Sequence, residues 1–175
     1  MKKILLIGAI FSIALSTQAQ KKVLWIGNSY TGANNLPNLT DDIANSLGDD
    51  ITYDSNTPGG NTLQQHSNNP VTYQKLHAND WDVVVLQAQS QEPSFPHGQV
   101  STNTYPYAAE LNDSIQSILT CSETMYYMTW GRETGDPQWD SINSFDKMNQ
   151  RLVNAYTFMS NENEASVAPA GVAWK

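Results

Sequence analysis

Apolar residues along this chain form short continuous runs that alternate with segments of helical periodicity. The runs lie at residues 22–26, 51–53, 81–87, 124–129 and 165–168. Between the runs, apolar residues recur at three- and four-residue intervals over residues 36–47, 108–118 and 145–159. Continuous runs are typical of parallel strands buried on both faces, and the three- and four-residue spacing is typical of amphipathic helices.

The alternation of strands and helices predicts an α/β fold, because each helix returns the chain to the next parallel strand. We expect a three-layer α/β/α sandwich around a doubly wound, mainly parallel five-stranded sheet. Pro37 and Gly48 mark the start and the end of the first helix. We expect loops at the polar segments 56–79, with one helical turn, 88–103 and 130–141. Since no repeat or linker divides the chain, residues 20–175 are expected to form a single domain.

Residues 1–19 carry the features of a secretory signal peptide in their usual order. Lys2 and Lys3 form a basic start, Ile4–Leu15 is the apolar stretch, and cleavage is expected after Ala19. An apolar stretch of this length is too short for a membrane-spanning helix. We therefore expect the mature protein to be secreted or periplasmic.

The charge and composition of the mature chain limit its partners. The full sequence has a net charge of -8, and loss of two lysines and no acid with the signal peptide takes this to -10. Such a surface argues against nucleic acid and anionic membranes as partners. Cys121 is the only cysteine, so no intrachain disulfide is possible. The sequence also lacks metal-ligand spacing and a phosphate-binding glycine loop, so we expect no metal and no cofactor.

Polar groups suited to acyl transfer follow three successive strands. Ser29 comes after the first predicted strand, Gly59 and Gly60 after the second, and Gln87 at the end of the third. The carboxyl ends of parallel strands share one edge of a sheet, where ligands bind. A hydroxyl nucleophile beside a glycine N–H and an amide donor would stabilise the oxyanion of an acyl-transfer reaction. Each group taken alone also fits an ordinary turn or strand cap, so the prediction rests on their joint occurrence.

The sequence resembles the SGNH hydrolase (GDSL-type esterase) superfamily, and within it a bacterial exported branch with Gly-Asn-Ser in the first block. The matching segments span nearly the whole mature chain in the expected order. They are Ile26–Thr31, Gly59–Leu63, Trp81–Ser90, Met128–Arg132 and Ala168–Trp174.

The resemblance implies that Ser29 is the catalytic nucleophile and that its own N–H and the N–H of Gly60 form the oxyanion hole. The usual Gly-x-Asn-Asp block is absent, and we expect Gln87 to supply the third donor, with Gln89 and Ser90 as rivals. Two residues after the glycines are expected to bind substrate. They are Asn61 and His66, the latter with a purely structural loop role as its alternative.

The general base is the main departure from the superfamily pattern. The resemblance implies an Asp-x-x-His motif after the fifth strand, but none of the three histidines, His66, His77 and His97, completes one. The sequence therefore predicts that the base lies beyond Lys175, in a longer reading frame, together with the helix that would cover the sheet.

The predicted function is that of an exported serine esterase that removes acyl groups, in particular O-acetyl groups on carbohydrate, through an acyl-Ser29 intermediate. The expected partner is a small-molecule or carbohydrate ester. The alternative is a non-catalytic domain that binds carbohydrate through the same cleft. Four aromatic residues are expected either to line a sugar site or to pack in the core: Trp130, Trp139, Tyr126 and Tyr127.

Overall fold

Five parallel strands form one sheet in the order β2-β1-β3-β4-β5. The computed structural model describes residues 20–174, and the predicted signal peptide, residues 1–19, lies outside the described residues. The strands are β1 (Lys21–Ile26), β2 (Ile51–Asn56), β3 (Val83–Leu86), β4 (Glu123–Tyr127) and β5 (Ser166–Ala168). In this order the chain first steps to one side of β1 and then to the other, which confirms the doubly wound topology.

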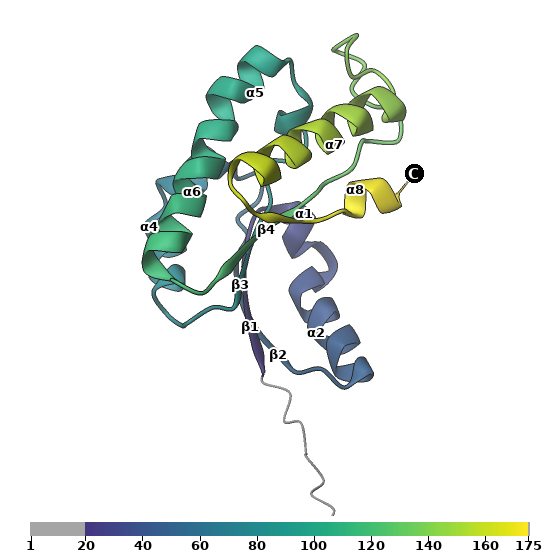
Figure 1. Ribbon diagram of the computed structural model, residues 1–175. Coiled ribbons are helices and arrows are strands. Elements are labelled where there is room, and N and C mark those ends of the chain that lie inside the picture. The colour runs from purple at the N-terminus through teal and green to yellow at the C-terminus, as the bar shows by residue number, and fades with distance from the viewer. Residues whose placement is uncertain (1–19, 175) are drawn as a thin grey trace, which may run out of the picture.

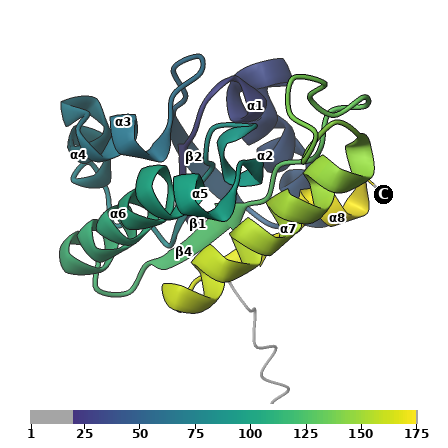
Figure 2. The same ribbon diagram turned by 90° about the horizontal axis from the view of Figure 1, so that it is seen from above.

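Helices cover both faces of the sheet, with α2 on one face and α4, α6 and α7 on the other (Figures 1 and 2). The longer helices are α2 (Leu36–Leu47), α4 (Pro70–Leu76), α5 (His97–Asn103), α6 (Tyr105–Ile118) and α7 (Phe145–Glu162). The shorter ones are α1 (Ser29–Gly32), η1 (Ala33–Asn35), α3 (Leu63–Ser67), η2 (Glu92–Ser94) and α8 (Ala170–Ala173). The three-layer α/β/α prediction is therefore confirmed. No helix within residues 20–174 is long and apolar enough to cross a membrane.

Helix α2 begins and ends where its sequence signals predict. Pro37 lies in the first turn, where its missing N–H costs no hydrogen bond. Gly48 follows the last helical residue with φ of 89°, and its N–H donates to the carbonyls of Ala44 and Asn45. A residue with a side chain rarely adopts this conformation, so the glycine stops the helix.

The polar segments 56–79 and 88–103 contain more helix than predicted. Helix α3 is held by a capping box, in which Thr62 accepts from the Gln65 N–H and the Gln65 side chain accepts from the Thr62 N–H. Helix α5 buries one apolar side chain, Val100, so it gives no hydrophobic period. These helices were missed because capping and local polar bonds stabilise them instead of an apolar face.

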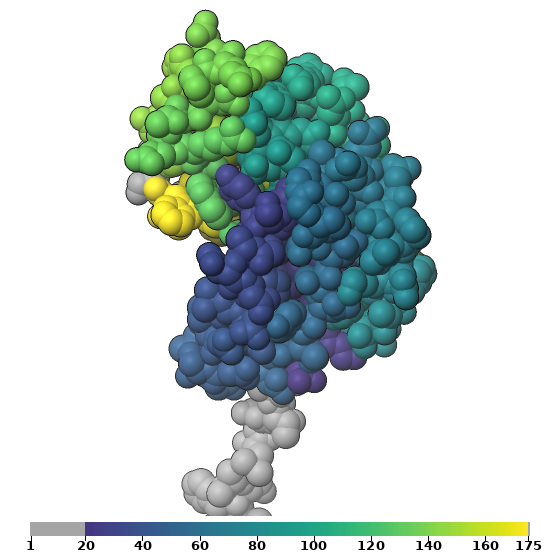
Figure 3. Space-filling view, turned by 180° about the vertical axis from the view of Figure 1, so that it is seen from behind, coloured from purple at the N-terminus to yellow at the C-terminus, as the bar shows by residue number. Residues whose placement is uncertain are grey.

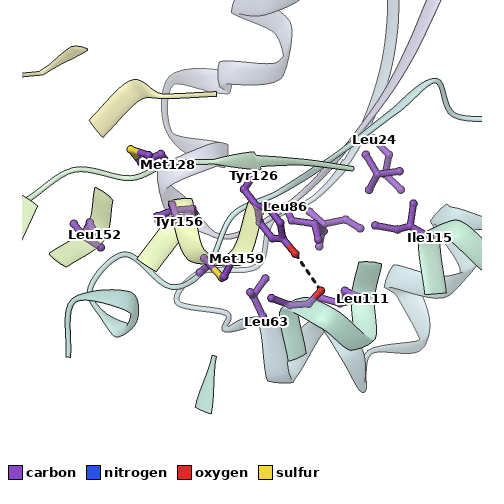
Figure 4. Close-up of a cluster of buried hydrophobic side chains, with 14 of the residues drawn as sticks. Leu24, Leu63, Leu86, Leu111, Ile115, Tyr126, Met128, Leu152, Tyr156 and Met159 are labelled. Carbon is purple, nitrogen blue, oxygen red and sulfur yellow. Dashed lines mark hydrogen bonds between the residues drawn. The ribbon is translucent and has the colours of Figure 1, made fainter. Parts of the chain in front are cut away.

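The main hydrophobic core lies between the sheet and helices α6 and α7. Alternate residues of the strands point into it, and Figure 4 shows them packed against side chains from the two helices. The labelled residues include Leu24, Leu86 and Tyr126 from the sheet, Leu111 and Ile115 from α6, and Leu152, Tyr156 and Met159 from α7. The Tyr126 hydroxyl donates to the Ala108 carbonyl at 3.2 Å, so this buried polar group is satisfied.

The opposite face of the sheet has a smaller core. Val23, Trp25 and Val85 are buried there, against partly buried residues that include Leu36 of α2. Leu39, Ile43 and Leu47 lie along the same side of α2 as Leu36 but remain exposed. The face of the sheet covered by α2 therefore leaves more apolar surface exposed than the face covered by α6 and α7.

Candidate active site

Ser29 lies at the carboxyl edge of the sheet, directly after β1 and a two-residue turn. It is the first residue of α1 and its side chain is exposed. Asn28 is the N-cap of α1, and its Oδ1 accepts from the Tyr30 N–H at 3.0 Å. The chain thus passes from strand to helix within two residues, Gly27 and Asn28, and the first helical residue, Ser29, is exposed.

The turn before Ser29 requires glycine at position 27. A Cβ atom built there would lie 2.7 Å from Gln87 Oε1 and 2.7 Å from Thr31 Oγ1. Both neighbours are buried and held by hydrogen bonds to each other and to the turn. A side chain at this position would therefore push the Gln87 amide out of its place.

Gln87 is fully buried, and its amide is used inside the protein. Its Oε1 accepts from the Asn28 N–H and from the Thr31 hydroxyl, each at 2.9 Å. Its Nε2 donates to the carbonyl of Ala88. The expected role of Gln87 as a direct oxyanion donor does not fit this packing, since its donor faces the backbone and its side chain is closed off from solvent. It braces the turn that carries Ser29 instead.

The sheet order places the loops after β2 and β3 on either side of Ser29. Residue Ile26 at the end of β1 pairs with Asn56 of β2 and with Leu86 of β3. The loop after β2 contacts the serine turn directly, because Asn28 Nδ2 donates to the Asn61 carbonyl oxygen at 3.0 Å. The tertiary structure therefore brings the predicted glycine loop and the predicted nucleophile together.

Gly60 in this loop has φ of 73°, which favours glycine, and it is exposed. Its N–H makes no hydrogen bond to any described residue, so it is open to a ligand. Asn61 lies next to it and is partly buried, with its N–H bonded to the Pro58 carbonyl at 3.3 Å. The Asn61 carbonyl accepts from the Asn28 side chain, and this bond attaches the loop to the serine turn.

In Gln87 both the amide oxygen and the amide nitrogen form hydrogen bonds, whereas in Gln89 only the amide oxygen bonds to described residues. Its Oε1 accepts from the backbone N–H groups of Gln91 and Glu92, at 2.8 and 2.9 Å. These two bonds fix the orientation of the amide, and no hydrogen bond from Nε2 to a described residue is present. Ser90, the other rival, is buried. Gln89 is therefore the residue after β3 that retains an oriented donor.

His66 is a fully buried residue, away from any substrate surface. Its Nε2 lies 2.8 Å from the Gly27 carbonyl oxygen and donates to it, which leaves Nδ1 to accept from the Thr72 hydroxyl at 3.1 Å. Burial lowers the pKa of His66, and the bond to Gly27 only partly offsets this. The expectation that His66 contacts substrate is corrected: it is a neutral structural residue that ties α3 to the serine turn.

The two remaining histidines lie on helix ends. His77 is the exposed C-cap of α4, and His97 begins α5, where its ring lies 6.2 Å from that of Tyr105. Within residues 20–174, no histidine or carboxylate forms a hydrogen bond with the Ser29 hydroxyl. The described part of the chain also contains no group of three or more His, Cys, Asp or Glu residues able to hold a metal ion.

A groove of about 460 Å³ opens beside Ser29, and we call it the serine groove. Figure 3 shows the molecule hollowed between the α1–α2 segment and α8. The groove is lined by Ser29, Tyr30, Ala33, Asn34, Leu36, Leu39, Tyr127, Trp130 and Trp174. Most of these residues are aromatic or aliphatic, so the wall beside the serine is largely apolar.

The four aromatic residues singled out in the sequence divide between the groove and the rest of the molecule. Trp130 and Tyr127 line the serine groove. Tyr126 is buried in the main core, and Trp139 packs on Phe95 with a ring distance of 5.7 Å. Tyr127 and Tyr126 are neighbours in β4 and point to opposite faces of the sheet, which explains their different surroundings.

Asn149 of α7 was not marked by any sequence motif, yet it anchors the far wall of the groove. This buried side chain accepts from the Gly131 N–H at 3.0 Å and donates to the Gly171 carbonyl at 2.9 Å. The two glycines adjoin the segments that carry Trp130 and Trp174. A buried asparagine on the apolar side of a helix was the available signal, because such a residue needs polar partners.

The sequence matches no protein-family model and no curated protein. Solved structures are nevertheless similar to this chain. A DUF4886 family protein from Bacteroides uniformis superposes with a TM-score of 0.75 at 18% identity, covering 89% of this chain and 69% of that one. The psychrotrophic esterase EstA from Pseudoalteromonas sp. has a TM-score of 0.60 at 13% identity, covering 84% and 75%. A variant of Axe2, an acetyl xylan esterase from Geobacillus stearothermophilus, has a TM-score of 0.57 at 14% identity, covering 88% and 78%.

At these identities the likeness concerns the fold alone. The chain has the α/β fold of the SGNH/GDSL-type esterases.

Proposed function

We propose that this protein is an exported serine esterase that hydrolyses O-acetyl groups on carbohydrate through an acyl-Ser29 intermediate. The proposal is supported by the exposed Ser29 and by two donors, in the loops after β2 and β3, that bond to no described residue: the Gly60 N–H and Gln89 Nε2. The first of these loops is bonded to the serine turn through Asn28. Esterases, including an acetyl xylan esterase, share this fold. The carbohydrate part of the proposal also draws on the aromatic wall of the serine groove.

In this mechanism Ser29 Oγ attacks the ester carbonyl carbon, and the carbonyl oxygen acquires a negative charge. The N–H groups of Ser29 and Gly60 and the Nε2 of Gln89 donate to that oxyanion. The oxyanion then re-forms the carbonyl while the C–O bond to the alcohol breaks, and the alcohol leaves with the proton that Ser29 gave up. Water hydrolyses the resulting acyl-serine, which releases the acid and restores the Ser29 hydroxyl. Gln87 and Asn28 take no part in bond making; they hold the turn so that the hydroxyl and donors keep their relative positions.

The mechanism also needs a general base that removes the proton from the Ser29 hydroxyl. Within residues 20–174, no histidine or carboxylate forms a hydrogen bond with that hydroxyl. This observation favours one second candidate, a non-catalytic domain that binds carbohydrate in the serine groove. Both candidates predict that the protein binds carbohydrate, but only the esterase predicts that it hydrolyses an ester.

The test compares the protein with its Ser29→Ala variant on p-nitrophenyl acetate and on acetylated xylo-oligosaccharides. The esterase proposal predicts that the substitution lowers kcat/KM by about a thousandfold or more. Ser101→Ala is a matched control, since Ser101 is partly exposed on α5 and bonds only within that helix. Equal hydrolysis by the Ser29→Ala variant would refute the nucleophile assignment.

A second measurement does not require turnover. An ethyl phosphonate ester with a p-nitrophenol leaving group should label the protein once, and peptide mass spectrometry should place the label on Ser29. Failure of both hydrolysis and labelling, with intact oligosaccharide affinity, would favour the binding domain. Export is tested separately: the mature protein in the culture medium or periplasm should begin at Gln20.

A further inference from the structure

A second hollow adjoins the serine groove at two tryptophans. It measures about 450 Å³ and is lined by Trp130, Gly131, Arg132, Glu133, Phe145 and Trp174. Trp130 and Trp174 line both hollows. The surface therefore continues from Ser29 past an aromatic pair to a charged region, which is longer than an acetyl group requires.

The aromatic residues of this surface form a stack. The rings of Tyr30 and Trp130 lie 5.2 Å apart, tilted by 37°, and those of Trp130 and Trp174 lie 5.4 Å apart, tilted by 33°. Trp174 is the outer member and is 63% exposed. A large exposed aromatic ring at the rim of a cleft is unfavourable in water, and such rings commonly mark a ligand surface.

We propose that the two hollows together bind a neutral oligosaccharide, with one sugar ring on the exposed outer ring of the stack, Trp174, and the next beside Arg132. The inference rests on the proposed carbohydrate-ester function and names the surface that recognises the carbohydrate. A pyranose ring presents C–H groups on its faces and hydroxyls at its edges. The faces suit an aromatic ring, and the edges suit fixed hydrogen-bond donors.

Arg132 is held in place and keeps donors to spare. Its Nη2 donates to Gln91 Oε1 at 2.9 Å, and its Nη1 lies 3.4 Å from Asp136 Oδ2. These contacts use two of the five N–H donors of a guanidinium group. The side chain is 43% exposed, so the remaining donors can reach a sugar hydroxyl in the second hollow.

The charges around the second hollow select a neutral ligand over an anionic one. Arg132 is paired with Asp136, and Glu133 lines the same hollow, so acids outnumber bases locally. The whole chain is also acidic, at -8. A uronic-acid polymer would be repelled by both, whereas a neutral sugar is unaffected by either.

The experiment titrates the Ser29→Ala protein, which cannot form the acyl-enzyme, with xylotetraose and follows tryptophan fluorescence and calorimetric heat. Saturable binding is expected, and Trp174→Ala in this background should weaken it about three- to tenfold, the effect of one aromatic contact. Trp139→Ala is the matched control, because Trp139 is 44% exposed but lies on Phe95 outside both hollows. It should leave the affinity unchanged.

Two other ligands test the specificity. Tetragalacturonate, a chain of the same length with a carboxylate on each ring, should bind more weakly than xylotetraose, and octanoate should not compete. The inference is overturned if xylotetraose does not bind, if Trp174→Ala and Trp139→Ala act alike, or if tetragalacturonate or octanoate binds more tightly. Because no outcome depends on turnover, a failure here is distinct from a failure of the esterase assay.

Discussion

The side-chain amide of Asn28 donates to the Asn61 carbonyl oxygen, with 3.0 Å between Nδ2 and O, while its Oδ1 caps α1. One side chain thus links the turn that presents Ser29 to the loop that presents Gly60. An aspartate here would retain the cap but would place a negative oxygen against a carbonyl oxygen. The amide therefore has a structural role of its own in this chain.

Substitution Asn28→Asp should lower the free energy of unfolding by about 1 kcal/mol, the usual value of one such hydrogen bond. Urea denaturation measures the change. Asn154→Asp is the control, because exposed Asn154 uses only its oxygen, as an acceptor from Gln150, and should change stability by less than about 0.5 kcal/mol. Equal effects in both variants would show that the Asn61 bond contributes nothing.

Substitution Gln87→Leu should destabilise the protein by about 2 kcal/mol or more. The buried Asn28 N–H and Thr31 hydroxyl would lose their acceptor, and an unsatisfied buried donor is costly. Gln150→Leu on the exposed side of α7 should have little effect in the same urea experiment. A stable Gln87→Leu protein would mean that the turn does not need this brace.

His66 should make the fold less stable in acid. Burial lowers its folded pKa below 6.5, so the unfolded state binds the proton more readily, and stability present above pH 6.5 is lost as the pH falls. The free energy of unfolding should therefore fall from pH 7 to pH 5, less steeply in His66→Gln than in the exposed control His77→Gln. Parallel slopes in the two variants would contradict the assignment.

Glu92 should make the fold less stable as the pH rises, which is opposite to the effect of His66. Burial raises the pKa of Glu92 to about 7, and the nearby Thr104 side chain only partly offsets this. The folded state then holds the proton above pH 4.5, so this stability is present in acid and is lost as the pH rises through about 7.

Substitution Glu92→Gln should accordingly raise stability at pH 8 by on the order of 1 kcal/mol, since Glu92 is only partly buried, and should change it little at pH 4. Thermal unfolding at the two values measures this. Glu110→Gln on the exposed side of α6 should show no such difference. If Glu92→Gln shifted the melting temperature equally at pH 4 and pH 8, the shift would not come from ionisation of Glu92.

The sequence determined the strands, the long helices and the place of the serine. Continuous apolar runs, the Pro37 and Gly48 helix signals and the glycine before Asn28 and Ser29 are local features, and local sterics and burial act on them directly. For the same reason the α/β class and the sheet were predictable, whereas the polar helices α3 and α4 were not.

Only the tertiary structure decided which polar groups remain open. Gln87 and Gln89 lie two residues apart after one strand, and nothing local distinguishes their amides. Gln87 is consumed because packing brings it under a turn 59 residues away in sequence, and His66 is buried because its partner carbonyl is 39 residues away. Trp130, which follows β4, and Trp174, at the end of α8, likewise come into contact only in the folded chain. Such pairings depend on the sheet order, because burial and hydrogen bonding between distant segments exist only once the strands have assembled.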